Sequence, residues 1–179
     1  LPKPDPYEPI VADVELAREL LRGRRVAWTS TLGDAETDTA VEATVRDTAE
    51  ALIAEVGLEL VDVPIDFPKP GRAWGALSAP DMAAWHLDRG LEHLDDLDFL
   101  ARVSIEGLPN LRARHLGAAV RRRQEILEAS AALFDEVDLL LLPTTPPTAF
   151  QAEGTLVGEV NGREVDLMYL SAPFTAPFN

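Results

Sequence analysis

Short apolar runs alternate with amphipathic segments in the first part of the chain. Residues 24–30 (RRVAWTS) and 58–65 (LELVDVPI) are rich in β-branched and aromatic residues, and each run predicts a strand. Between them, residues 39–56 repeat apolar side chains at helical spacing and predict a helix. A strand, a helix and a strand with short joints form a βαβ unit, so we expect the two strands to be parallel and joined by a right-handed crossover.

Local signals mark where the first helices begin and end. Thr39 and Glu42 have the spacing of a capping box, which predicts that the helix begins at Thr39, and Gly57 predicts its end. An earlier helix is predicted over residues 11–21, where apolar residues also recur at helical spacing, and Gly23 stops it.

Two long helices are predicted in the middle of the chain. The first covers residues 78–103, opened by a capping-box spacing of Ser78 and Asp81 with Pro80 in the first turn. Its apolar side is formed by leucines at 87, 91, 94, 97 and 100. The second covers residues 112–137 and again repeats apolar positions at helical spacing.

A run of four leucines, residues 139–142, predicts a central strand that is buried on both faces and stopped by Pro143. Ligands of open α/β sheets bind at the carboxyl ends of such strands, where Thr144 and Thr145 lie. Their hydroxyls and the rigid Pro146 are the candidate substrate-binding residues. The alternative is that both hydroxyls only satisfy backbone groups at the end of the strand.

The rest of the chain completes an α/β prediction with a mixed, largely parallel sheet flanked by helices. Residues 1–9 contain four prolines and predict an extended linker. Residues 10–179 are predicted to form one domain that is incomplete at both ends, because the chain starts with Leu1 and finishes in an apolar, proline-rich tail. An Asn161-Gly162 pair predicts a β-hairpin within residues 156–167 (LVGEVNGREVDL).

Composition narrows the classes of partner. The 179 residues are 46% hydrophobic and 26% charged, as in globular proteins, and carry a net charge of −15 at pH 7. This charge repels phosphate backbones, so we expect no nucleic-acid partner. No run approaches the roughly 20 apolar residues of a membrane helix, so no membrane partner is expected. The lack of cysteine fits a cytoplasmic protein.

Residues that could perform catalysis are hard to find. The serines lie in no G-x-S-x-G or S-x-x-K pattern, and the phosphate-binding glycine loops are absent. Lys3 and Lys69 lie in proline-rich loops, which do not desolvate an amine as a lysine base requires. His86 and His93 are seven residues apart among acidic residues, which indicates a solvated face rather than a metal site. We therefore predict no catalytic residue, no metal and no cofactor in this chain.

Three segments resemble the amidase signature family. They are residues 24–65, with a strand of the R-V-A-W-T type, an Ala-rich helix and a strand ending in Val-Pro; residues 138–149 (DLLLLPTTPPTA); and the closing APFN at 176–179. The resemblance implies amide hydrolysis by a serine, a second serine in a cis peptide and a lysine, with an oxyanion hole formed by a glycine- and serine-rich loop. None of these motifs occurs here, so what the resemblance carries over is limited to the turn at residues 143–146, as a wall of the substrate pocket, and to Phe178 and Asn179 at the end of the chain.

The sequence therefore predicts the C-terminal portion of an amidase signature hydrolase, inactive alone. Its expected partners are a small amide substrate and the missing N-terminal half of the same protein, with a homodimer left open. Two alternatives remain: a non-catalytic α/β module that binds a small ligand, and the amidase subunit of a tRNA-dependent amidotransferase, which would work with partner subunits and glutamine.

Overall fold

A computed structural model describes residues 13–33, 35–87, 91–97, 99–150, 157–166 and 173–178. The linker predicted at residues 1–9 lies outside these ranges. The helices of the described part are α1 (Val14–Leu21), α2 (Thr39–Val56), α3 (Ala73–Leu87), α4 (Phe99–Glu106) and α5 (Ala113–Glu136), with short 3-10 turns η1 (Leu91–Asp96), η2 (Leu108–Asn110) and η3 (Ala176–Phe178). None of these helices combines the length and the apolarity that crossing a bilayer requires.

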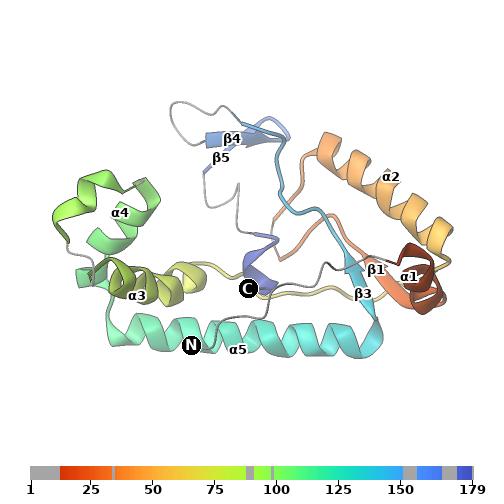
Figure 1. The fold of residues 1–179 in the computed structure, drawn as a ribbon, viewed down its shortest axis with the longest axis horizontal. Helices are drawn as coiled ribbons and strands as arrows, with labels where there is room; N and C mark the ends of the chain where they lie inside the picture. The colour runs from red at the N-terminus through yellow and green to blue at the C-terminus, as the bar shows by residue number, and fades with distance from the viewer. Residues whose placement is uncertain are drawn as a thin grey trace.

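A parallel sheet forms the centre of the fold, as the βαβ pattern predicts. Strand β1 (Arg25–Trp28) lies between β2 (Glu59–Leu60) and β3 (Leu139–Leu141), and both neighbours run parallel to it (Figure 1). Val26 of β1 is completely buried and is in register with residues of both neighbouring strands. Apolar side chains therefore cover the middle of this sheet on both faces.

The predicted position of the leucine run within the sheet is wrong. In the described part of the chain, β1 is the central strand and β3 pairs only with β1. Leu140 packs on the core cluster around Ile126 and Leu133, whereas Leu139 packs on the cluster around Val26. The leucines of β3 are half-buried rather than buried, so the continuous apolar run indicates packing on both faces but neither full burial nor hydrogen bonding along both edges.

The first turn of α2 corrects the predicted cap. The N-cap is Asp38 rather than Thr39, because the Asp38 carboxylate accepts a hydrogen bond from the backbone N–H of Ala40 at 3.0 Å. Gly57 ends the helix as predicted, in the left-handed conformation with φ of 76°.

The helix predicted over residues 78–103 is also wrong. Helix α3 begins earlier, at Ala73, and ends at Leu87, and η1 and α4 follow it in place of one continuous helix. Ser78 therefore lies inside α3, where its hydroxyl donates to the Trp74 carbonyl at 2.9 Å instead of capping the helix. The prediction for residues 112–137 is confirmed by α5.

A second, antiparallel sheet consists of β4 (Val157–Val160) and β5 (Arg163–Asp166). Asn161 and Gly162 connect the two strands with φ of 52° and 77°, the positive values that a tight hairpin turn requires. This confirms the hairpin predicted from the Asn-Gly pair.

Candidate functional site at the carboxyl end of the sheet

The turn after β3 is rigid and presents two threonines. Pro143 and Pro146 are buried, whereas Thr144 and Thr145 are exposed. The Pro146 carbonyl accepts a hydrogen bond from the backbone N–H of Asp38 at 2.9 Å, which fixes the turn to the start of α2. Within the described residues neither threonine hydroxyl has a hydrogen-bond partner, so both can bind a ligand. Binding of substrate by Thr144, Thr145 and Pro146 stays a prediction.

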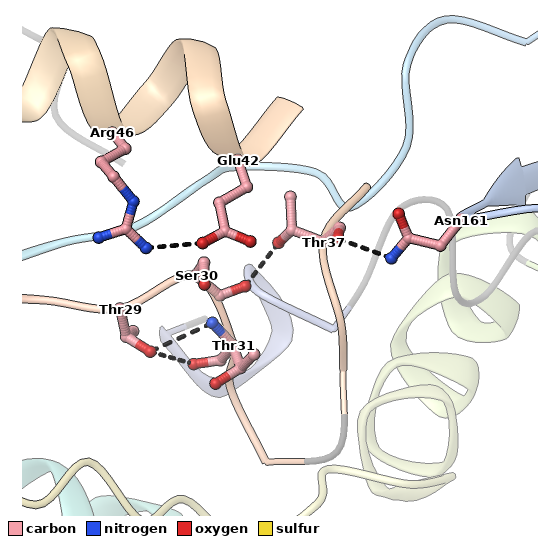
Figure 2. Close-up of polar contacts among 7 residues, drawn as sticks. All are labelled: Thr29, Ser30, Thr31, Thr37, Glu42, Arg46 and Asn161. Atoms are coloured by element: carbon pink, nitrogen blue, oxygen red, sulfur yellow. Dashed lines mark hydrogen bonds and ion pairs between the residues drawn. The ribbon is translucent and has the colours of Figure 1, made fainter. Parts of the chain in front are cut away.

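The segment after β1 lies at the same edge of the sheet. The backbone N–H of Thr29 donates to the Leu141 carbonyl at 3.1 Å, which extends the pairing of β1 with β3. The Thr29 hydroxyl donates to the Thr31 carbonyl at 2.6 Å and accepts from its N–H at 3.1 Å. The buried Thr37 hydroxyl donates to the Ser30 carbonyl at 2.6 Å (Figure 2). These hydroxyls hold the backbone of the loop and are therefore occupied.

An ion pair covers this loop from α2. The Arg46 guanidinium donates to the Glu42 carboxylate at 2.6 Å (Figure 2). It also lies 5.4 Å from the centre of the Trp28 ring, a cation–π contact. Hydrogen bonds from Arg46 and then from the Ser30 hydroxyl lower the pKa of Glu42. A carboxylate with a lowered pKa is a weak proton acceptor, so the contacts of Glu42 favour an anchoring role over a general base.

The hairpin tip contacts the start of α2. The Asn161 side-chain carbonyl accepts from the backbone N–H of Thr39 at 3.0 Å. Its amide donates to the Thr37 carbonyl at 3.2 Å (Figure 2). The backbone N–H of Asn161 donates to the Asp38 carboxylate at 3.1 Å. This bond, followed by the one from Ala40, lowers the pKa of Asp38. We refer to the contacts among Thr37, Asp38, Thr39 and Asn161 as the hairpin latch.

The sequence did not predict the hairpin latch. Asp38 immediately precedes a predicted helix, which is a recognisable N-cap signal, but Asn161 is identifiable from sequence only as a turn residue. The two residues are 123 positions apart, and no local pattern connects them.

Among the described residues, neither the tryptophans of α3 nor the histidine and lysine side chains form a reactive centre. Trp74 and Trp85 are 40% and 55% exposed on α3, and Trp85 contacts the His86 ring edge-on, with 4.7 Å between ring centres. Across the described ranges, no three His, Asp or Glu side chains lie close enough together to hold a metal ion. Lys3 lies outside these ranges, and Lys69 lies in the loop before α3.

Known proteins share both the sequence pattern and this fold. An acylamidase from Rhodococcus erythropolis is 25% identical over 173 residues, which covers 93% of this chain and 35% of that protein. The crystal structure of a bacterial aryl acylamidase of the amidase signature family superposes with a TM-score of 0.72 at 21% identity, over 93% of this chain and 37% of the other. An inhibitor-bound vestigial protein complex, related to the origins of an s-triazine catabolic enzyme, gives a TM-score of 0.65 at 21% identity, over 92% of this chain and 35% of the other. No family profile matches the chain.

These similarities confirm the resemblance to the amidase signature family. The chain has the α/β fold of part of those enzymes, with a parallel sheet flanked by helices. It spans only about a third of the length of the relatives that it matches.

Proposed function

We propose that this chain is the C-terminal portion of an amidase signature hydrolase and that it supplies one wall of the acyl pocket to the whole enzyme. The observation that carries the proposal is the superposition of 93% of the chain on 37% of an aryl acylamidase. The sequence motif of the β3 turn supports it independently. The whole enzyme would convert an amide and water into a carboxylate and an amine, in the cytoplasm.

The roles within the site follow from the contacts described above. Because the chain lacks the serine, second serine and lysine motif, nucleophile and base come from the rest of the enzyme. Thr144 and Thr145 then face the substrate, and Pro146 sets their position. A neutral hydroxyl bonded to the substrate contributes about 0.5–1.5 kcal/mol, which corresponds to roughly a 2- to 10-fold change in KM.

An aryl amide is the substrate class to test first, because relatives are described as acylamidases. The gene that encodes this sequence is expressed in full, and hydrolysis of para-nitroacetanilide is compared with that of the purified 179-residue chain. We expect turnover by the whole product and none by the 179-residue chain. Turnover by the chain alone would contradict the proposal that its chemistry lies elsewhere.

The threonines are tested by replacing each with valine, which keeps the shape of the side chain and removes the hydroxyl. Thr144→Val and Thr145→Val should raise KM in the whole enzyme by the factor given above. Thr148→Val is the matched control, because Thr148 is an exposed residue of the same segment. An effect at Thr148 equal to that at the other two positions would remove the argument for a specific pocket wall.

The amidotransferase alternative makes a different prediction. The structure related to s-triazine catabolism is described as a protein complex, so a partner subunit is compatible with this fold. Glutaminase activity that appears only after partner subunits are added would favour this alternative. Ligand binding without hydrolysis by the whole product would favour the non-catalytic module.

A further inference from the structure

Asp38 joins three segments that are distant in the sequence. Its carboxylate accepts one hydrogen bond from Ala40 in the first turn of α2 and another from the backbone of Asn161 in the hairpin. Its own backbone N–H donates to the carbonyl of Pro146 in the turn after β3 at 2.9 Å. The residue that caps α2 therefore also holds the hairpin and the candidate substrate-binding turn.

Asn161 completes this connection from the other side. Its side-chain amide donates to the carbonyl of Thr37 (Figure 2), and its side-chain carbonyl accepts from the backbone N–H of Thr39; these are the residues on either side of Asp38. Asparagine tolerates the positive φ of 52° that the turn imposes and keeps its amide available for these bonds. The backbone on both sides of Asp38 is thus fixed by one side chain of the hairpin.

The turn at residues 143–146 couples the position of Asp38 to the positions of Thr144 and Thr145. Pro143, Pro146 and Pro147 are buried, and proline limits φ to a narrow range, so the turn has little freedom to deform internally. A displacement of the Pro146 carbonyl consequently moves Thr144 and Thr145 with it. Misplacement of the two hydroxyls weakens their hydrogen bonds to a substrate, because a hydrogen bond depends steeply on distance and angle.

The Arg163–Glu36 contact adds little to this arrangement. It joins the same hairpin to the segment before α2 at 3.5 Å, and both side chains are about 60% exposed. Ion pairs of this kind are screened by solvent. The polar contacts of Asn161, rather than this ion pair, carry the restraint.

We infer that Asn161 and Asp38 are positioning residues: the hairpin latch sets the placement of the Thr144–Thr145 turn against the substrate. This inference rests on the proposed amidase function and assigns a role in substrate binding to the β4–β5 hairpin. Neither residue touches the reacting atoms.

The test is Asn161→Gly in the whole gene product. Glycine adopts the positive φ freely, so the hairpin turn is retained while both side-chain bonds are removed. Hydrogen exchange followed by mass spectrometry is measured on the peptide that contains Asp38 and Thr39, whose amides bind Pro146 and Asn161. We expect faster exchange of these amides and a roughly 3- to 10-fold rise in KM for para-nitroacetanilide, with kcat changed less than about 2-fold. Glu164→Gln, on the exposed part of the same hairpin, is the matched control and should change neither quantity.

The outcomes distinguish a failure of the positioning role of the hairpin latch from a failure of the proposed amidase function. Faster exchange with an unchanged KM would make the hairpin latch purely structural and would overturn the inference. Unchanged exchange would show that Asn161 does not hold this segment and would overturn it as well. If the unsubstituted whole product hydrolyses no amide, the proposed function fails, and this is seen before any variant is compared. A rise in KM for Glu164→Gln equal to that for Asn161→Gly would also contradict a specific role for Asn161.

Discussion

Two regions of the molecule are held together in different ways. The sheet unit, residues 25–60 with β3 and the turn at residues 143–146, contains the fully buried Val26 and the loop whose backbone is fixed by Thr29 and Thr37. The helical arm, residues 73–106, consists of α3, η1 and α4 and lies at the opposite end of the molecule from α1 and α2 (Figure 1). Its described residues expose four large apolar side chains: Trp74, Trp85, Phe99 and Val103.

The difference shows where a precise site can be built. Hydrogen bonds to backbone groups fix positions to a few tenths of an ångström, and the sheet unit uses them wherever the chain leaves a strand. The helical arm instead buries small or medium side chains, Ala83, Ala101 and Ile105, and packs against α5. Apolar packing of this kind is less directional. The candidate site accordingly lies on the sheet unit.

The largest expected effect contrasts buried and exposed valines in the two regions. Val26→Asp places an unpaired carboxylate in the centre of the sheet, and we expect the free energy of unfolding to fall by about 4 kcal/mol or more. Val103→Asp, on α4, makes the same chemical change at a side chain that is 47% exposed, and should cost about 1 kcal/mol or less.

Urea unfolding followed by circular dichroism measures both valine variants. If Val26→Asp stays folded while Val103→Asp unfolds, the comparison between the two regions is reversed. Equal effects of the two substitutions would mean that the side chains at 26 and 103 are equally important for stability, which would remove the contrast between the two regions.

Replacing two glycines with alanine should change the stability of the protein by intermediate amounts, in opposite directions at the two positions. Gly57 ends α2 with φ of 76°, where an alanine side chain is strained, so Gly57→Ala should destabilise the protein by about 1–2 kcal/mol. Gly75 lies inside α3 without a positive φ, and the space that a methyl group would occupy there is open. Gly75→Ala should therefore stabilise the helical arm by up to about 1 kcal/mol.

Thermal unfolding of the two alanine variants checks these signs. A higher melting temperature for Gly57→Ala would show that the left-handed cap is not required. A lower one for Gly75→Ala would show that α3 is not helical at this residue, and the helical arm would then need a different description.

The contrast between the sheet unit and the helical arm also explains which elements could be predicted from the sequence. The sheet unit follows from local signals: β-branched runs at β1, helical spacing in α2 and glycine at its end all predict the observed elements. The prediction of one helix over residues 78–103 was wrong because the leucine spacing in the sequence continues past Leu87, whereas the chain forms η1 and then α4 after that residue. Periodicity shows that side chains share a face, but it does not require that the helix stay continuous.

The candidate site was predictable only in part. The Pro-Thr-Thr-Pro turn is visible in the sequence because prolines bound it and a buried strand precedes it. Its partner Asp38 and the hairpin residue Asn161 are not, since their contacts depend on how the β4–β5 hairpin packs on α2. The edge position of β3 in the described sheet was likewise decided by tertiary packing.

The smallest expected effect is a pH dependence of stability that arises at Asp38 in the sheet unit. Hydrogen bonds from the backbone of Asn161 and then of Ala40 hold the pKa of Asp38 below its ordinary value of 3.8. Because the folded-state pKa is lowered, the carboxylate contributes stability that is present above pH 3.8 and is lost as the pH falls through the folded-state pKa.

Asp38→Asn isolates this contribution, because asparagine still caps a helix but has no charge and only one acceptor oxygen. At neutral pH the unsubstituted protein should be slightly more stable than the variant, and the gap should close as the pH falls below 3.8. Asp81→Asn, at an exposed position of α3, is the matched control for replacing a carboxylate with an amide. Denaturant unfolding at several pH values measures the stability difference between each variant and the unsubstituted protein. A difference for Asp38→Asn that is constant with pH would mean that the charge of Asp38 does not stabilise the hairpin latch.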